Sequence, residues 1–447
     1  MPSAPKVERS KKFTILAYDG FQLAEFHTRA EIGPGESSER FGAIRVANNY
    51  PSHSTDLDGI PGRLKVNKRQ EPGRPGRVVV VTGMAVTTGY GQGVDALREG
   101  IWSGEPAFVP VTRFDTSRYR VDVAAQAAPE LDLDTELLAL TEEALKQAGL
   151  SEGERAEAPL VMARHADPAV SRLPRAEQQS RPISHTATML SRELGLGGAG
   201  RTYTNACVAA STAIAEAAAL ISSGRNERVV VSAGHLVDAE SFTTFNAGKA
   251  LAKDGRLRPF SAGRQGLLLG DGAGALVLEA ADSRPGMRPL ARLTGWGMAG
   301  DAHHVCQPHP QGLGMARAIN RALDRAELGP ADLDYINAHG TGTPYNDSAE
   351  TAALHRAFGE HAEHIPVSST KSMHGHALQA GGLVEFVICL LTLQLGTLPV
   401  NSGWLGPDPD CRLDLVLDSP RPVDTRHVLS LNAAFGGANT ALVVSAV

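Results

Sequence analysis

The residues Asn205-Ala206-Cys207 lead directly into a run of small and apolar residues, VAASTAIAEAAALIS, at positions 208–222. A second stretch repeats this arrangement, because Gly375-His376 leads into ALQAGGLVEFVICLLTLQL at positions 377–395. Both runs are small or apolar nearly all round, which predicts two helices buried in the centre of the fold rather than amphipathic helices on its surface.

The ends of the two regions are also alike. Gly270-Asp271-Gly272-Ala273-Gly274 precedes the apolar run 275–278, and Gly436-Gly437-Ala438-Asn439 precedes the apolar run 441–444. This repetition predicts a duplicated α/β unit in which helices are buried between layers. The two helix N-termini would then lie close together, and their partial positive charge favours a thiolate or an oxyanion nearby.

The first 76 residues differ from the rest of the chain. Two short strand-like runs, 13–18 and 21–26, flank Asp19-Gly20 and predict a hairpin, and the charged, proline- and glycine-rich stretch 68–76 is typical of a linker. The valine-rich run 77–81 then predicts a strand buried on both faces that ends at Thr82-Gly83. We therefore expect an extension at 1–76, a first half at 77–285 and a second half at 286–447.

Composition favours a soluble globular protein. The 447 residues are 42% hydrophobic and 21% charged, and the formal net charge of −6 gives no support for nucleic-acid binding. Residues 1–12 lack the apolar segment of a signal peptide, which favours a cytoplasmic protein. The apolar stretch 383–400 is interrupted by Glu385, Gln394 and Pro399, and this favours a buried helix over a membrane span.

Cys207 is the first candidate for chemistry. It lies between a polar turn and the start of a buried helix, an environment that lowers the pKa of a thiol. An arbitrary intracellular cysteine is more often a small buried packing residue than a catalytic one. The neighbouring motifs must therefore show whether Cys207 is catalytic. These motifs are two histidine-containing loops, one with His339 after the strand-like run 333–336 and one with His376 at the end of 368–376.

Five motifs in order give the region 77–447 a specific resemblance. The chain resembles the thiolase-fold condensing enzymes, and most closely the type II elongating β-ketoacyl-[acyl-carrier-protein] synthases. The motifs lie at 78–83, 205–211, 258–274, 337–350 with 368–376, and 432–439. The resemblance implies a thiolase-like α/β fold with five layers, α-β-α-β-α.

The resemblance also implies roles for individual residues. Cys207 matches the nucleophile that accepts the acyl group, and His339 and His376 match the paired catalytic histidines. Lys371 matches the lysine that supports the second histidine, and Glu385 matches a supporting acid, which we group with the substrate-binding residues. The remaining matches concern substrate binding. Thr341 and Thr343 match threonines that hydrogen-bond the phosphopantetheine arm. Phe435 matches an aromatic gate residue, whose backbone N–H is expected to join that of Cys207 in an oxyanion hole.

These matches imply decarboxylative condensation of an acyl thioester on Cys207 with malonyl-acyl carrier protein, in a fatty-acid or polyketide-type pathway. No cofactor or metal is implied, since the substrates arrive on the phosphopantetheine of a carrier protein, and the expected assembly is a homodimer or a ketosynthase heterodimer. Two alternatives stay open: a non-condensing acyltransferase, and a non-catalytic partner subunit resembling a chain-length factor. A thiolase is disfavoured because the loop 433–437 has no second cysteine. A priming synthase is disfavoured because that class has asparagine in place of the second histidine, whereas positions 339 and 376 are both histidine here.

Several positions depart from the family pattern. Ser261, Gly263 and Gln265 replace residues that are commonly acidic, Asn346 stands where glycine is usual, and Ala433-Ala434 replaces the usual Phe-Gly. Together with the extension, these departures favour a specialised pathway over primary fatty-acid synthesis. The acyl chain itself cannot be inferred from the sequence.

Two further clusters have competing interpretations. His303, His304, Cys306 and His309 have metal-ligand chemistry at short spacing, but their position favours a wall of the active-site pocket. A second, basic cluster is interpreted as a docking patch for an acidic carrier; its members are Lys249, Lys253, Arg256 and Arg258. For Lys253 and Arg256 an ordinary solvated surface is the alternative interpretation.

Overall fold

The computed structural model describes residues 14–19, 22–27, 76–166, 170 and 172–447, and the chain divides into two compact units, Met1–Glu71 and Pro72–Val447. In the first unit, β1 (Thr14–Asp19) pairs antiparallel with β2 (Gln22–His27). The predicted hairpin is therefore present, but each strand begins and ends one residue later than expected. Gly20 and most of the predicted linker lie outside the described residues.

A single strand order occurs twice in Pro72–Val447. The first five strands follow the order β3-β10-β9-β7-β8, and the second five follow β11-β18-β17-β12-β13. In each set the first three strands pair antiparallel and the last three pair parallel. The bounds of the first set are β3 (Val79–Thr88), β10 (Gly272–Ala280), β9 (Arg228–His235), β7 (Leu160–Arg164) and β8 (Ala199–Tyr203). Those of the second are β11 (Ala291–Gly300), β18 (Ala438–Ser445), β17 (His427–Ala433), β12 (Tyr335–Asn337) and β13 (Pro366–Ser368).

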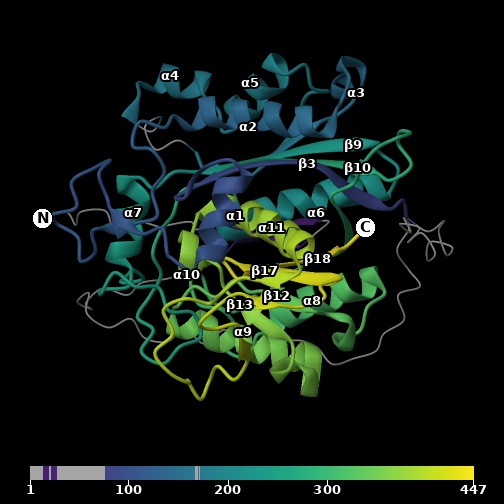
Figure 1. The fold of residues 1–447 in the computed structure, drawn as a ribbon. Helices are drawn as coiled ribbons and strands as arrows, with labels where there is room; N and C mark the ends of the chain where they lie inside the picture. The colour runs from purple at the N-terminus through teal and green to yellow at the C-terminus, as the bar shows by residue number, and fades with distance from the viewer. Residues whose placement is uncertain (1–13, 20–21, 28–75, 167–169, 171) are drawn as a thin grey trace, which may run out of the picture. The chain divides into compact units, whose positions relative to one another are not determined.

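Helices and sheets alternate in five layers (Figure 1). Helix α2 (Leu133–Ala148) packs on β3, β10 and β9, and α8 (Leu313–Ala326) packs on β11 and β18. Strands β3 and β11 pair antiparallel and so join the two sets at one edge. Between the two sets lie α6 (Ala209–Ser222) and α11 (Leu378–Leu395), which contact each other. The predicted duplicated, thiolase-like α/β architecture is thus confirmed.

The two central helices are buried as their sequences predict. Helix α6 follows a short 3-10 turn (Ala206–Val208), and most of its alanines are fully inaccessible. By length and composition α11 is the one helix among the described residues that could cross a membrane, yet 83% of it is buried inside this fold. Here it serves as the core helix of a layered protein, in agreement with the prediction.

The first strand of the main unit is longer than expected. Strand β3 continues through Thr82-Gly83 to Thr88 instead of ending there. A Cβ atom at Gly83 would lie 2.1 Å from the carbonyl oxygen of Ala144 in α2. Gly83 therefore permits close packing of a helix on the strand, and it does not mark a turn.

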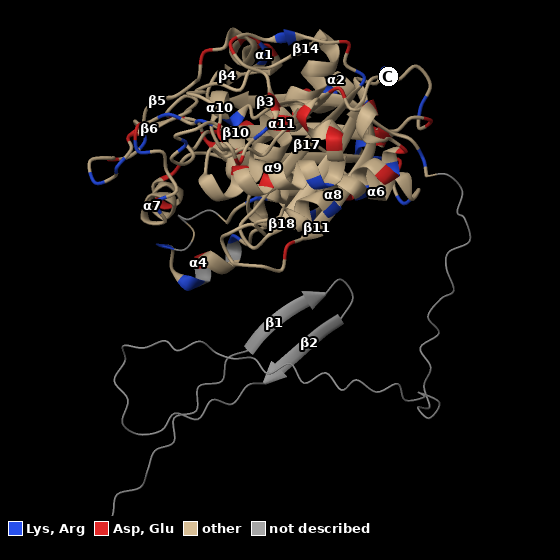
Figure 2. Cartoon of the chain, turned by 90° about the horizontal axis from the view of Figure 1, so that it is seen from below, with Lys and Arg blue, Asp and Glu red and all other residues tan. Residues whose placement is uncertain are grey.

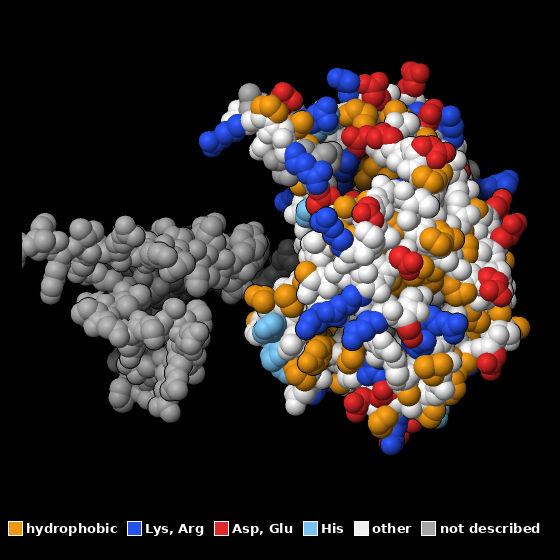
Figure 3. All heavy atoms as spheres, turned by 90° about the vertical axis from the view of Figure 1, so that its left-hand side faces the viewer, with side chains coloured by type: hydrophobic (Ala, Val, Ile, Leu, Met, Phe, Trp, Pro, Cys, Tyr) orange, Lys and Arg blue, Asp and Glu red, His pale blue; other side chains and the backbone are white. Residues whose placement is uncertain are grey.

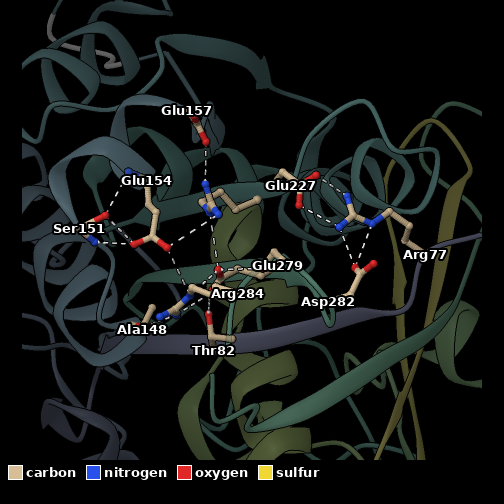
Figure 4. Close-up of polar contacts among 12 residues, drawn as sticks. Arg77, Thr82, Ala148, Ser151, Glu154, Glu157, Glu227, Glu279, Asp282 and Arg284 are labelled. Carbon is tan, nitrogen blue, oxygen red and sulfur yellow. Dashed lines mark hydrogen bonds and ion pairs between the residues drawn. The ribbon is translucent and has the colours of Figure 1, made fainter. Parts of the chain in front are cut away.

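A buried polar network fixes the ends of the first sheet (Figure 4). The fully buried Glu279 of β10 accepts hydrogen bonds from Thr82 Oγ1 at 2.6 Å and from Arg284 at 2.9 Å. Arg228, at the start of β9, lies 3.6 Å from the same carboxylate. Glu154 forms a capping box with Ser151 at the start of α3 (Glu152–Ala156). Paired acids and bases thereby hold strand ends and a helix start together without leaving a buried charge alone.

The remaining elements are shorter or lie at the periphery, and Figure 2 shows acidic and basic residues interspersed along the described chain. The helices are α1 (Val94–Ser103), α4 (Arg175–Ser180), α5 (His185–Glu193), α7 (Ala239–Ala247), α9 (Pro344–Phe358) and α10 (Lys371–His374). Two 3-10 turns span Pro330–Asp332 and Gly359–Glu363. The short strands are β4 (Gly91–Gln92), β5 (Val109–Pro110), β6 (Val123–Ala124), β14 (Thr397–Leu398), β15 (Asp414–Leu415) and β16 (Arg421–Pro422).

Candidate active site

The candidate residues follow the carboxyl ends of the parallel strands in both sets. Cys207 comes after β8, and His339 comes after β12. Lys371 and His376 follow β13, and Phe435 follows β17. Ligands in α/β sheets bind outside the carboxyl ends of strands, so this placement is the one expected of a working site.

Cys207, His339 and His376 line a single cavity of about 430 Å³. The structure thus brings together three residues that are up to 169 positions apart in the chain, counted from 207 to 376. Other predicted residues on the same wall are Thr341, Thr343, Phe435, Gln265, Asn346, Ala433 and Ala434.

The backbone before Cys207 is strained. Ala206 has a φ of 53°, in the left-handed region that non-glycine residues seldom adopt. This conformation turns the chain from β8 into the 3-10 turn that carries Cys207, whose side chain is 7% exposed at the cavity wall. Strain of this kind is typical of functional positions.

The acidity of Cys207 differs from the prediction. Burial raises the pKa of the Cys207 thiol to about 12, although the positive charge of Lys371 and a backbone N–H act in the opposite direction. The prediction of a lowered pKa was wrong because the sequence shows the helix start but not the loss of solvent around the sulfur. The resting residue is a thiol, and a proton acceptor is needed when it reacts.

The backbone of His376 is clamped from both sides. Its N–H donates to the carbonyl of Leu268 at 2.8 Å, and its carbonyl accepts from the N–H of Gly270 at 3.1 Å. The preceding Gly375 has a φ of 72°, and a Cβ there would lie 2.6 Å from the carbonyl oxygen of Leu269. Only glycine fits this position, which repeats the left-handed geometry before Cys207.

His339 is held through its own backbone by an acid. The N–H groups of His339 and Gly340 each donate to one oxygen of Glu350, both at 2.7 Å. The rings of His339 and His376 meet edge to face, with centroids 5.4 Å apart. Burial and the nearby Lys371 lower the pKa of both histidines well below 6.5, so both rings are neutral near pH 7.

Lys371 and Glu385 lie behind the cavity rather than in it. Their side chains are fully buried and form an ion pair, and the other oxygen of Glu385 accepts a hydrogen bond from Asn432. Glu385 does not line the cavity, so the prediction that it belongs with the substrate-binding residues is corrected. Its contact is with Lys371, whose charge it balances.

The predicted threonines and the predicted gate lie at the cavity wall. Thr341 Oγ1 and Thr343 Oγ1 are 2.8 Å apart. Phe435 is 50% exposed and stacks on Phe245 of α7, with centroids 5.9 Å apart. The amides of Ala434, Gly436 and Gly437 all donate hydrogen bonds, while the N–H of Phe435 has no partner within the described part of the chain.

The histidine-rich loop 303–309 forms part of the wall. Cys306, Gln307 and Pro308 line the cavity, and the carbonyl of Val305 accepts a hydrogen bond from the N–H of Gly436. His304 Nδ1 accepts from the backbone of Cys306. Among the described residues, no three His, Cys, Asp or Glu side chains are grouped to hold a metal ion.

Sequence reasoning missed some of the lining residues. Phe245 lines the cavity, but no motif surrounds it in the sequence. Tyr345 also lines the cavity and lies within the motif 337–350, where no feature singled it out. Conversely, Arg258 was predicted as part of a docking patch, yet it is buried and paired with Asp254 at 2.6 Å. That prediction is wrong for Arg258.

Comparison with known proteins places the chain in a family. The N-terminal domain of beta-ketoacyl synthases matches residues 135–283, and the C-terminal domain matches residues 290–404. A Streptomyces halstedii chain named as a polyketide beta-ketoacyl synthase is 33% identical over 415 residues, which are 83% of this chain and 98% of that one. The 3-oxoacyl-[acyl-carrier-protein] synthase 2 of Staphylococcus aureus is 35% identical over 261 residues, 57% of this chain and 65% of that one.

Solved structures show the same fold. The ishigamide ketosynthase/chain length factor covers 83% of this chain and 100% of its own, with 29% identity and a TM-score of 0.77. A type II polyketide ketosynthase solved with its acyl-carrier protein covers 84% of this chain and 100% of its own, with 26% identity and a TM-score of 0.76. The chain therefore belongs to the β-ketoacyl synthase family, the condensing enzymes of fatty-acid and polyketide synthesis, and is an acyltransferase in general class.

Proposed function

We propose that this protein is an elongating β-ketoacyl synthase that condenses an acyl group on Cys207 with malonyl-acyl carrier protein. The observation that carries the proposal is the meeting of Cys207, His339 and His376 in one cavity. A non-catalytic partner subunit has no need of a thiol and two neutral histidines in one cavity, so the alternative of a chain-length-factor-like protein is disfavoured.

The first half-reaction loads the enzyme. The Cys207 sulfur attacks the carbonyl carbon of the acyl thioester, the thiol proton leaves, and the carrier thiol departs, so that one thioester replaces another. Because burial holds Cys207 as a thiol, a neutral histidine in the cavity is suited to take the proton. The unpaired N–H of Phe435 supports a role in binding the tetrahedral oxyanion together with the N–H of Cys207.

The second half-reaction forms the carbon–carbon bond. The malonyl group loses carbon dioxide, and the electron pair of the broken bond moves into an enolate whose oxygen carries negative charge. Neutral His339 and His376 can each donate one N–H to that oxygen. The enolate carbon then attacks the Cys207 thioester, and the bond to sulfur breaks. We assign Lys371 and Glu385 as positioning residues, and Thr341 and Thr343 as contacts of the phosphopantetheine arm.

Partner binding and assembly are part of the same proposal. No cofactor is needed beyond the phosphopantetheine of the carrier protein. Figure 3 faces the side on which α7 lies and shows Lys and Arg side chains gathered there, which suits an acidic carrier. Lys249 lines the cavity, and Lys253 and Arg256 are exposed. The exposed β8 ends the sheet, so its free edge suits pairing with a second ketosynthase chain in a homodimer or heterodimer.

The organisation and location of the chain are also proposed. The repeated strand order supports two halves, 77–285 and 286–447, after an extension at 1–76. A cytoplasmic location fits a protein whose substrates are carried by soluble acyl-carrier proteins.

Mass spectrometry after incubation with an acyl-carrier substrate tests the proposal. We expect an acyl adduct on Cys207 that is lost in Cys207→Ala and kept in Cys306→Ala, because Cys306 is the other thiol lining the cavity. Labelled malonyl-carrier protein should then release carbon dioxide and give a β-ketoacyl product. An adduct unchanged in Cys207→Ala would refute the assignment, and acyl transfer without carbon dioxide release would favour the non-condensing acyltransferase.

A further inference from the structure

A second cavity of about 440 Å³ lies at the carboxyl ends of β7 and β9. Its wall is formed by the ends of these strands, the starts of α2 and α11, and one side of α7; the members used below are His235, Gln379, Phe245 and Leu378. A volume of this size is in the range of small-molecule sites. Nothing in the proposed chemistry so far requires it.

The second cavity adjoins the first. Phe245 lines both, and Leu378 packs in the same apolar cluster as Cys207. His235 is close enough to His376 that a positive charge on it lowers the pKa of His376. The two cavities therefore share a wall at Phe245, close to the residue that would carry the acyl chain.

Glu240 Oε1 in this cavity makes no hydrogen bond but is ion-paired with Arg172. Two further buried polar atoms there have neither kind of partner in the described structure. They are Nε2 of His235 and Oε1 of Gln379, in side chains that are each only 6% exposed. Buried polar groups are almost always satisfied, and each unsatisfied one is costly. Two such atoms in one cavity leave hydrogen-bonding positions that a molecule bound there can occupy.

Most other polar groups on the wall are already engaged within the protein. Asp132 accepts from the N–H of Thr135, and Asp238 accepts from the N–H of Ser241. Arg164 pairs with Asp134, and Glu240 pairs with Arg172. These acids make the wall unfavourable for a carboxylate, and their existing partners reduce their attraction for an ammonium group.

The unsatisfied groups call for a neutral partner. Burial lowers the pKa of His235, so its ring is uncharged and offers one donor and one acceptor. The Gln379 amide also offers both kinds of group. A hydroxyl or carbonyl oxygen can hydrogen-bond to either residue, whereas a hydrocarbon chain would fill the cavity and leave both unsatisfied.

We propose that the second cavity holds the distal part of the acyl chain and selects chains that carry a neutral oxygen there, a hydroxyl or a carbonyl. This inference rests on the proposed acylation of Cys207. It assigns His235 and Gln379 as specificity-determining residues for the oxygenated chain.

The test compares acyl-pantetheine thioesters of one chain length. Octanoyl thioesters, unsubstituted or with a single hydroxyl or keto group at each distal carbon, are offered to the wild-type protein, and the rate of Cys207 acylation is followed by mass spectrometry. At least one oxygenated chain is expected to react roughly ten- to a hundredfold faster than the unsubstituted chain. Gln379→Leu and His235→Phe should each reduce this preference while acylation by the unsubstituted chain persists, which separates lost selectivity from misfolding.

Gln394→Leu is the matched control, since it makes the same change at an exposed position of α11 outside both cavities and should leave the ratio of rates as in the wild type. Acylation of Cys207 with no preference for any oxygenated chain would overturn the inference and leave the proposed function intact. A preference for a distal carboxylate or ammonium group would also overturn it. If no thioester acylates Cys207, the proposed function fails and the inference fails with it.

Discussion

Lys371 and Glu385 form an ion pair in which neither side chain is exposed to solvent. The pair joins α10, which precedes His376, to the middle of the core helix α11. An unpaired charge buried at this depth destabilises the folded protein by much more than the ion pair stabilises it. Removing one partner and removing both should therefore have different effects.

Glu385→Leu is expected to destabilise the protein by about 3–5 kcal/mol, because it leaves a buried ammonium group without a partner. The double variant Lys371→Met/Glu385→Leu should recover much of this loss. Urea unfolding of the two single variants and the double variant measures the coupling. Glu142→Gln, in the exposed pair with Lys146, is the control and should leave the unfolding midpoint unchanged. Additive effects of the two core substitutions would contradict the prediction.

Gly375→Ala should abolish condensation. The new methyl group would lie 2.6 Å from the carbonyl of Leu269, and the backbone that positions His376 would have to move. Gly286→Ala is a matched control, because Gly286 has a similar φ of 74° but has no atom within 4 Å of the added Cβ. Both variants place alanine at a positive φ, but only Gly375→Ala also meets a backbone atom, so only this variant should lose product in the elongation assay. Full activity of Gly375→Ala would show that His376 does not need this clamp.

Cys207 should become easier to alkylate as pH rises. Burial raises its pKa to about 12, so the thiolate fraction increases by about tenfold per pH unit through the alkaline range. The rate of iodoacetamide labelling is measured in Cys306→Ser, which removes the exposed thiol. A rate that is flat above about pH 7 would mean that the start of the helix outweighs burial.

His374 should make the protein sensitive to acid. Burial lowers its pKa to about 3, whereas in the unfolded chain the value is near 6.5. Between these values the unfolded state binds a proton that the folded state does not, so stability falls as pH falls. His374→Asn should reduce this slope by up to about 1.4 kcal/mol per pH unit. Urea unfolding at pH 6.5 and at about pH 5 measures it, with the exposed His361→Asn as control; an unchanged slope would contradict the assignment.

The sequence was sufficient for the central helices and for the prediction that Cys207, His339 and His376 share one site, which the structure places in the first cavity. The runs at 208–222 and 377–395 are apolar nearly all round. A helix formed by such a run has no polar face to turn toward solvent, so it is expected to be buried between layers. Cys207 and His376 could be paired because both stand at the start of such runs. The strand order of the two sheets then confirmed the duplication.

The missed features depend on distances across the fold. The pKa of Cys207 is set by how much solvent the folded chain removes, which no local pattern reports. Glu385 resembles a supporting residue in sequence, but only the fold shows that it stays outside the cavity. Gln379 and His235 lie 144 positions apart, counted from 235 to 379, and only β9 and α11 bring them to one wall.

The twofold repetition of the strand order has a consequence for biosynthesis of the enzyme itself. Cys207 follows β8 of the first set, whereas His339 and His376 follow β12 and β13 of the second. A nascent chain that has completed only the first set carries the thiol but neither histidine. Under the proposed mechanism such a chain lacks both histidines that condensation requires, so activity depends on the two sets having come together.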